Sequence, residues 1–222
     1  MVVALIVADG DVPARAAVER LLGGAPALVV AADGGALKAE AIGFPPHVVV
    51  GDADSLDPAQ ADRLRSAGAE VIVHPAAKDE SDTELALNEA LNRGATRVVI
   101  VGAFGGRRLE HTLANVLLLA SERLRGRDIC LADGASTLRV MHDGKSLQLS
   151  GAPGDYVSLL PLTGHVSGVT TVGLRYTLTG EMLEQGPARG LSNELMDTNA
   201  TVQIGQGRLA VVHTRRNEVA DR

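Results

Sequence analysis

The chain of 222 residues is short of several features, and each shortage excludes a class of protein. Its one cysteine, Cys130, rules out an intrachain disulfide, and the apolar run around it predicts a buried thiol. No apolar run approaches the ~18–20 residues that a membrane-spanning helix needs. The apolar start, Met1 to Ala8, lacks a basic leader and runs into Asp9-Gly10-Asp11, which indicates a first strand rather than a secretory signal. We therefore expect a cytoplasmic protein.

Positive charge and aromatic side chains are also scarce. The net charge is −6, and the whole acidic excess lies in residues 1–135, which hold 19 acidic and 13 basic side chains. Aromatic residues make up 2% of the chain, and no basic stripe interleaved with aromatics is present. We therefore expect neither a nucleic acid nor a membrane as a partner. A G-x-x-x-x-G-K-S/T loop is absent, which excludes an ordinary P-loop kinase.

The composition, with 45% apolar and 22% charged residues, predicts a folded protein, and the length predicts one or two domains. Residues 1–135 alternate apolar, β-branched runs with helix-like stretches. The expected strands are 2–7, 28–31, 48–50, 70–74, 97–101 and 128–132. The expected helices are 13–22, 36–41, 58–67, 82–93 and 111–124. Because these strands are apolar throughout, we expect a parallel α/β sheet with helices on both faces and ligands at its carboxyl ends.

From Ser136 onward the pattern changes to short strands separated by glycine-containing turns, which predicts an all-β sandwich domain over residues 136–222. The expected strands are 138–142, 146–150, 155–161, 165–171, 176–178, 182–184, 199–204 and 208–214. Residues 215–222 are expected to be a frayed polar tail. No Pro/Ser-rich linker precedes this region, so we expect a tight junction near Ser136.

Two acidic clusters follow predicted strands. Ala32-Asp33-Gly34-Gly35 exposes backbone amides that a ligand can approach, although a plain Asp-Gly turn explains it equally well. In Gly51-Asp52-Ala53-Asp54-Ser55 the two aspartates can converge on a hard cation at a strand-to-loop bend. Asp57 or Ser55 accounts for a cap on the next helix, which leaves Asp52 and Asp54 unexplained.

Two further clusters come after the fourth and fifth strands. In the segment from Lys78 to Glu84, Ser81 or Asp82 can cap a helix, and Lys78, one of three lysines against eighteen arginines, can contact a phosphate. In the segment from Gly102 to Asn115, glycines allow a phosphate-compatible bend and Arg108 can fork onto phosphate oxygens. His111 is either a general base or a residue that starts a helix.

Together these strand ends bring acidic and basic side chains to one crevice. Packed carboxylates repel each other and an incoming polyphosphate unless a cation compensates them, and Mg²⁺ resolves both problems. The pattern predicts phosphoryl-type transfer by positioning and charge neutralisation, without a covalent enzyme intermediate.

These clusters resemble the thiamine pyrophosphokinase family, whose members move a pyrophosphoryl group from ATP to the hydroxyl of thiamine. The matching strings occur in the family's order: Ala32-Asp33-Gly34-Gly35, Gly51-Asp52-Ala53-Asp54-Ser55, the run from Lys78 to Leu87, Arg108-Leu109-Glu110-His111-Thr112-Leu113-Ala114-Asn115, and Gly190-Leu191-Ser192-Asn193-Glu194. The resemblance implies an α/β domain that binds ATP and Mg²⁺ over residues 1–135. It also implies a β-sandwich for thiamine binding and dimerisation over residues 136–222, and a homodimer with active sites at the subunit interface.

Site residues follow from the same resemblance. Asp52, Asp54 and Asp82 are the implied Mg²⁺ ligands. Asp54, Asp82, Arg108 and Glu110 are the implied catalytic residues, with Asp82 or Asp54 as the acceptor of the alcohol proton. The implied nucleotide contacts are Asp33, Gly34, Lys78, Ser81, Arg108 and His111. Ser192, Asn193 and Tyr176 are the implied thiamine contacts, and Tyr176 would stack on an electron-poor ring unless it is only strand filler.

The chain departs from the family's usual Arg-x-Asp-His, because Glu110 stands in the acid's place and Arg107 is an additional residue before the motif arginine. Two other interpretations of the residues stay open. Asp52 and Asp54 could belong to an Asp-x-Asp phosphatase or a nucleotide-sugar transferase. Alternatively, the chain is a non-catalytic sensor that binds thiamine or nucleotide and regulates a partner.

Overall fold

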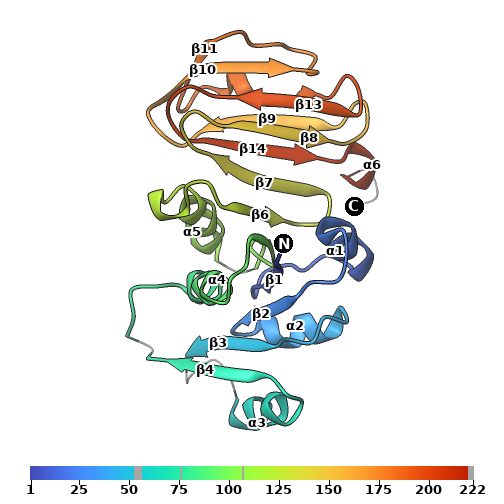
Figure 1. Ribbon diagram of the computed structural model, residues 1–222, viewed down its shortest axis with the longest axis vertical. Helices are drawn as coiled ribbons and strands as arrows, with labels where there is room; N and C mark the ends of the chain where they lie inside the picture. The colour runs from blue at the N-terminus through green and yellow to red at the C-terminus, as the bar shows by residue number, and fades with distance from the viewer. Residues whose placement is uncertain (53–56, 76, 107, 220–222) are drawn as a thin grey trace. The chain divides into compact units, whose positions relative to one another are not determined.

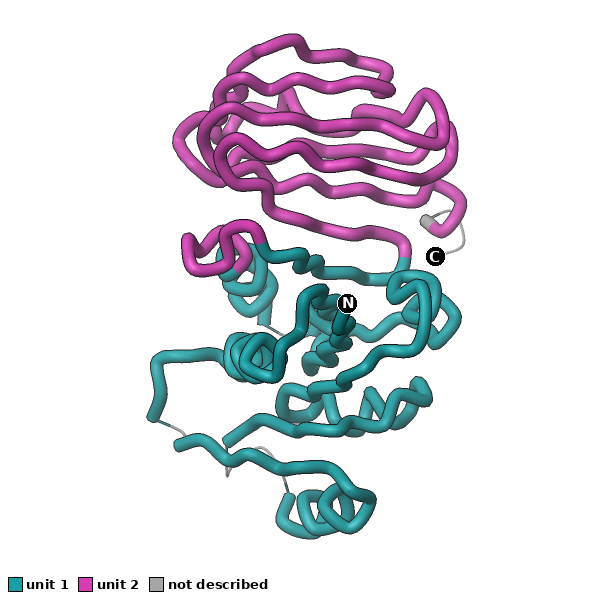
Figure 2. The backbone as a smooth tube through the Cα atoms, in the orientation of Figure 1, with its two compact units in different colours: residues 1–118, 127–134 teal, residues 119–126, 135–222 magenta. Residues whose placement is uncertain are grey.

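A computed structural model describes residues 1–52, 57–75, 77–106 and 108–219. Figure 2 colours its two compact units. The first unit comprises Met1–Leu118 and Arg127–Gly134, and the second comprises Leu119–Gly126 and the chain from Ala135 onward. The sequence-based boundary at residue 136 differs from this division chiefly in residues 119–126, which are grouped with the second unit.

The first unit is an α/β domain (Figure 1). Its strands are β1 (Val3–Val7), β2 (Leu28–Ala32), β3 (Val48–Asp52), β4 (Glu70–His74), β5 (Arg97–Val101) and β6 (Asp128–Ala132). Its helices are α1 (Arg15–Leu22), α2 (Gly35–Ala41), α3 (Pro58–Ser66), α4 (Asp82–Asn92) and α5 (Leu109–Leu119). All strand pairs are parallel, in the order β6-β5-β1-β2-β3-β4. The expected parallel sheet is confirmed.

Burial explains why these strands are apolar throughout. Residues 4–7 of β1 are each 0% exposed, as a strand covered on both faces requires. One hydrophobic cluster joins Leu5 and Val99 of the sheet to Val18 of α1 and to Phe44. Cys130 of β6 belongs to the same cluster and is 2% exposed, so the expected burial of its thiol is confirmed.

The direction of the chain reverses across the sheet at β1. From β1 it moves to β2, β3 and β4, and then returns to β5 and β6 on the other side. Such a switch point leaves a crevice outside the carboxyl ends of the two central strands. Here the loops after β1 and β5 are joined by backbone hydrogen bonds, Gly10 N to Gly102 O and Asp11 N to Phe104 O, both 2.8 Å. A Cβ at Gly10 would lie 2.2 Å from the Phe104 carbonyl, so only glycine fits there.

The second unit consists of two antiparallel sheets, ordered β12-β9-β14-β7 and β11-β10-β13-β8. Its strands are β7 (Ser136–Met141), β8 (Ser146–Ser150), β9 (Tyr156–Pro161), β10 (His165–Val172), β11 (Glu181–Glu184), β12 (Asn193–Glu194), β13 (Asn199–Gln203) and β14 (Leu209–Thr214). One core cluster combines Val157 and Val211 of the first sheet with Val166 and Val202 of the second. This shared core is that of the expected β-sandwich.

Three sequence-based expectations about elements were wrong. The expected strand 176–178 is irregular, because the Asn193 amide binds both backbone groups of Tyr176, at 3.0 and 2.7 Å. The expected helix 111–124 is divided into α5 and a short 3₁₀ helix, η1 (Glu122–Leu124), because Ser121 is extended, with ψ 136°. The expected tail forms helix α6 (Arg216–Val219) within its described part.

Across the described residues, none of the helices combines the length and apolar character needed to cross a membrane.

A buried carboxylate with several hydrogen bonds lies in the second unit. The Asp155 carboxylate, 4% exposed, accepts hydrogen bonds from His213 Nε2 at 3.0 Å, Ala152 N at 3.0 Å and Arg216 N at 3.1 Å. Burial raises the pKa of Asp155, but the amides of Ala152 and Arg216 and the His213 imidazole outweigh it and lower that pKa below its ordinary value. The carboxylate therefore stabilises the fold in its ionised form.

Replacing Asp155 with asparagine should destabilise the second unit by about 2 kcal/mol at pH 7, because hydrogen bonds to a charged group are lost. A carboxyl whose pKa is lowered by folding contributes stability above its unfolded pKa, and this contribution is lost as pH falls through the folded pKa. The difference in unfolding free energy between wild type and D155N should therefore narrow as the pH falls below 3.8, the ordinary pKa of an aspartate. Urea unfolding at pH 7 and pH 3 measures it, with the exposed Glu184→Gln as control. A difference that is equal at both pH values would contradict the assignment.

Candidate active site

A cleft of about 900 Å³ lies in the first unit, at the carboxyl ends of β1, β2 and β5. The loops after these strands form its walls, together with the first turns of α4 and α5. Its lining residues are Ala8, Asp9, Gly10, Ala32, Asp33, Lys38, Ser81, Asp82, Thr83, Gly102, Ala103, Gly105, Gly106, Arg108, Glu110, His111, Ala114 and Asn115. The cleft thus coincides with the switch point of the sheet, where α/β proteins bind ligands.

Most of the predicted site residues in this unit line the cleft. They are Asp33, Ser81, Asp82, Arg108, Glu110 and His111. Gly34 is the residue before α2 and follows the lining residue Asp33. Lys78 is not one of the lining residues, but it forms an ion pair with the lining residue Asp82. Asp52 ends β3 and is not one of the lining residues, and Asp54 lies outside the described residues.

Asp33 has an unusual backbone. Its φ is +51°, in the left-handed region that residues other than glycine rarely adopt. Its N–H donates to the Val50 carbonyl at 2.8 Å, which ties the loop after β2 to β3. Among the described residues, the other non-glycine residue with positive φ is Ser192, at +58°. Backbone strain of this kind clusters at functional sites, and both positions are predicted site residues.

The first turn of α4 combines a helix cap with an ion pair. The Ser81 hydroxyl accepts a hydrogen bond from Glu84 N at 3.2 Å, so Ser81 is the N-cap. Lys78 Nζ contacts Asp82 Oδ1 at 2.6 Å, and the lysine side chain is only 12% exposed. Asp82 therefore compensates a mostly buried ammonium group at the wall of the cleft. Asp57 similarly caps α3 by accepting from Ala59 N, which settles that alternative.

Arg108 and Glu110 form a second pair at the start of α5. Arg108 Nε donates to Glu110 Oε1 at 2.6 Å, and both side chains are more than 60% exposed. This hydrogen bond lowers the pKa of Glu110 below its ordinary value. The same hydrogen bond lets Glu110 orient the Arg108 guanidinium.

Asn115, Asp9 and Lys38 are among the cleft residues that were not predicted as site residues. Asn115, 7% exposed, donates from Nδ2 to the Ala103 carbonyl at 2.9 Å and so positions the loop after β5. Asp9 and Lys38 form an ion pair of 2.9 Å between the loop after β1 and helix α2. Asp9 carries the same signal as Asp33, an acidic residue before a glycine at a strand end. Lys38 carries a weaker one, the rarity of lysine in the chain.

The donor chemistry of this region fits a hard divalent cation. The cleft lining carries four carboxylates, of Asp9, Asp33, Asp82 and Glu110, against the two permanent cations Lys38 and Arg108. Oxygen ligands of this type suit Mg²⁺. Within the described residues, no three His, Cys, Asp or Glu side chains converge into a preformed metal centre. A divalent ion here would therefore be coordinated partly by oxygen atoms of a bound phosphate, as is common for Mg²⁺.

The predicted thiamine contacts lie together in the second unit. The Asn193 side chain is 7% exposed and holds the backbone of Tyr176, while the Tyr176 ring is 61% exposed. The Arg175 guanidinium carbon lies 5.7 Å from the centre of that ring, within the range of a cation–π contact. Ser192 N donates to Ser158 Oγ at 3.1 Å, and this contact fixes the strained residue to β9.

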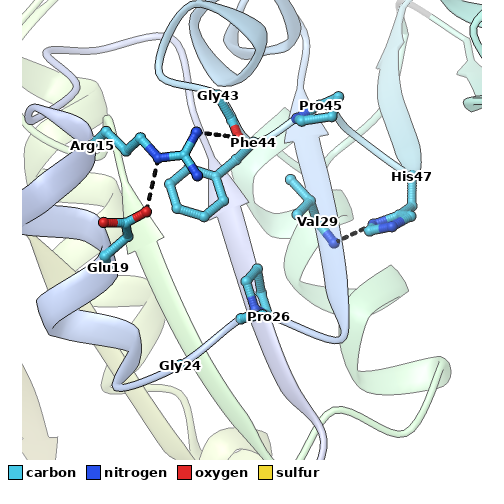
Figure 3. Close-up of a pocket in the computed structure, with 10 residues that line it drawn as sticks. Arg15, Glu19, Gly24, Pro26, Val29, Gly43, Phe44, Pro45 and His47 are labelled. Carbon is cyan, nitrogen blue, oxygen red and sulfur yellow. Dashed lines mark hydrogen bonds and ion pairs between the residues drawn. The ribbon is translucent and has the colours of Figure 1, made fainter.

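A second depression, of about 510 Å³, lies near the amino ends of β2 and β3 (Figure 3). Arg15 lies over the Phe44 ring at 5.3 Å and donates to Glu19 and to the Gly43 carbonyl. His47 Nδ1 accepts from Val29 N at 2.9 Å. The residues that line this depression include none of the predicted site residues, so we assign the candidate active site to the larger cleft.

Comparisons with known proteins show which family the chain is similar to. A family sequence model described as "Thiamin pyrophosphokinase, catalytic domain" matches residues 20–131. A second, described as "Thiamin pyrophosphokinase, vitamin B1 binding domain", matches residues 144–209. The thiamine pyrophosphokinase of Bacillus subtilis strain 168 is 27% identical over 187 residues, which cover 84% of this chain and 87% of that protein.

Solved structures share the whole fold. The crystal structure of thiamine pyrophosphokinase from Bacillus subtilis superposes with a TM-score of 0.82 at 24% identity, covering 96% of this chain and 99% of that one. A thiamin pyrophosphokinase family protein from Enterococcus faecalis superposes with a TM-score of 0.80 at 30% identity, covering 97% and 99%. With the catalytic-domain model matching half of its length and the vitamin B1 binding-domain model following in order, the chain belongs to the thiamin pyrophosphokinase family.

Proposed function

We propose that this chain transfers a pyrophosphoryl group from ATP to the hydroxyl of thiamine, giving thiamine diphosphate and AMP. The alcohol oxygen forms a bond to the β-phosphorus, the bond from that phosphorus to the oxygen bridging the α-phosphorus breaks, and the hydroxyl proton is released. The observation that carries the proposal is the match of a catalytic-domain and a vitamin B1 binding-domain model, in order, to one chain. The cleft at the switch point, with its aspartates and cations, supports it.

Mg²⁺ is part of the proposal because the acidic residues of the first unit fit it. Asp52, Asp54 and Asp82 are the residues that would hold the ion, with Asp82 at the cleft wall and Asp52 at the end of β3. When bound, the ion supplies neutralisation of phosphate charge. Lys78 engages one oxygen of Asp82 and keeps that carboxylate in place at the start of α4.

The other residues have positioning and charge-neutralising roles. Arg108 and Lys78 would contact the phosphates, beside Asp33, Gly34, Ser81 and His111 as nucleotide contacts. Arg108 supplies a fork of donors that suits phosphate oxygens, and the ionised Glu110 fixes the direction of that fork. Tyr176, Ser192 and Asn193 would contact thiamine, with the exposed Tyr176 ring facing its electron-poor heterocycle. The rate then comes chiefly from positioning and charge stabilisation.

A homodimer is also part of the proposal, and in addition to the β-sandwich expected for dimerisation, α5 of the first unit offers an apolar contact face. Leu109, Leu113 and Leu117 are 72%, 56% and 61% exposed, and their spacing of four residues puts them on one face of α5. An exposed apolar stripe of this kind marks a protein interface. Because α5 also carries Glu110 and His111, a second copy on this stripe would lie next to the cleft.

The purified protein, incubated with ATP, Mg²⁺ and thiamine, should form AMP and thiamine diphosphate in equal amounts. Mass-resolved chromatography measures both products. Removal of the metal with EDTA should stop the reaction, and added Mg²⁺ should restore it. Formation of ADP or free phosphate instead would favour a kinase or phosphatase, and tight thiamine binding with no turnover would favour a sensor.

Substitution of Asp82 with asparagine should lower kcat by about 100-fold or more, because a charge that holds the metal and the phosphates is lost. Steady-state kinetics at several Mg²⁺ concentrations measure the effect, and the metal requirement should rise. Asp62→Asn, at an exposed residue of α3, is the matched control. Asp52→Asn should behave like D82N, and unaffected kinetics would remove Asp52 from the site.

Replacing Leu117 with aspartate should shift the protein from dimer to monomer, because a charge on an apolar interface must be desolvated. Sedimentation velocity at micromolar concentration measures the species. Leu37→Asp places the same charge at a 41% exposed leucine of α2 and should leave the assembly unchanged. A wild-type protein that sediments as a monomer would contradict the dimer, whatever the variants do.

A further inference from the structure

Lys38 is held by three oxygen atoms at the wall of the cleft. Its Nζ lies 2.9 Å from the Gly10 carbonyl and 2.9 Å from Asp9 Oδ1, and it also donates to the Asp9 carbonyl. An ammonium group has three N–H donors, so each finds an acceptor. The side chain reaches from α2 to the loop after β1 and is 39% exposed, with one side toward the cleft.

The three acceptors differ in how easily they can be replaced. Two are neutral backbone carbonyls of a loop that is fixed to the neighbouring loop by the Gly10 N to Gly102 O hydrogen bond. The third is the carboxylate of Asp9, whose side chain is 62% exposed. The carbonyls therefore fix the position of the ammonium group, and only Asp9 supplies a negative charge that another anion can replace.

The Asp9 carboxylate packs closely against Gly34. A Cβ at Gly34 would lie 2.7 Å from Asp9 Oδ1, so the absence of a side chain at position 34 accommodates the carboxylate between the loop and α2. The chain also uses lysine sparingly, with three against eighteen arginines. Lys38 lines this cleft and is paired with Asp9, and Lys78 is paired with the lining residue Asp82. A compact ammonium suits an exchangeable point contact, whereas a guanidinium favours a fixed fork.

We propose that Lys38 is a phosphate-binding residue for the nucleotide, and that Asp9 is its counter-ion until a phosphate oxygen takes the place of the carboxylate. The proposal rests on the proposed function for the identity of the nucleotide. Binding then exchanges one ion pair for another, so Lys38 never lacks a negative partner. Asp9 moves into solvent, where its charge is hydrated.

Opposite changes at the two residues test this exchange. Lys38→Gln should weaken ATP binding about 10-fold or more, because a charged hydrogen bond to phosphate is lost. Asp9→Asn should tighten ATP binding several-fold, because the competing carboxylate is removed. Isothermal titration with ATP and Mg²⁺, without thiamine, measures both dissociation constants. Lys145→Gln removes the remaining lysine, an exposed residue of the second unit, and should bind ATP as the wild type does.

Kinetics separate this proposal from the proposed function. K38Q should raise the KM for ATP and leave the KM for thiamine unchanged, provided that the wild type forms AMP and thiamine diphosphate. A wild type that binds ATP but forms other products overturns the proposed function and leaves the test of Lys38 valid. Unchanged ATP affinity in K38Q overturns the role of Lys38. Weaker ATP binding in D9N overturns the counter-ion role of Asp9. The ATP affinity of D9N also tests the proposed exchange of ion pairs where K38Q fails to fold.

Discussion

A parallel sheet that is covered on both faces can meet water and ligands only at its ends. In the first unit, residues 4–7 of β1 are fully buried, and the apolar cluster around Leu5 and Val99 continues into α1. Polar side chains are consequently confined to the loops, and the reversal of strand order at β1 decides which loops diverge enough to admit a ligand. The position of the cleft, its glycine-rich walls and its acidic lining all follow from that constraint.

Within the cleft, opposite charges are paired before any ligand arrives. Three ion pairs each join a cation suited to bind phosphate to a carboxylate suited to bind a metal ion or to hold that cation. They are Lys78–Asp82, Lys38–Asp9 and Arg108–Glu110. Such pairing spares the folded protein from uncompensated charge at a partly buried site. It also means that binding of a metal and a polyphosphate rearranges existing ion pairs, which limits the electrostatic cost of forming the complex.

Sequence reasoning located the cleft because each acidic motif follows a buried, β-branched strand. It predicted that Asp33, Asp82 and Arg108 belong to one crevice, and all three line the cleft. It did not identify Lys38. This residue lies on α2 but contacts the loop after β1, and that contact depends on how α2 packs against the loop in the folded domain. Tyr176 was assigned to a strand for a related reason, since the amide of Asn193, seventeen residues away, removes its backbone from the ladder. Local pattern thus predicted strand ends well and side-chain pairs poorly.

The left-handed backbones of Asp33 and Ser192 set a limit on how far this protein can be stabilised. Each costs about 1 kcal/mol that glycine would avoid. Laboratory evolution under heat selection alone would drift toward glycine at both positions and would lose the carboxylate and the hydroxyl along with the strain. Because Asp33 and Ser192 are proposed substrate contacts, we expect thermal tolerance and turnover to compete at these two residues, so a screen for robust variants needs a simultaneous demand for turnover.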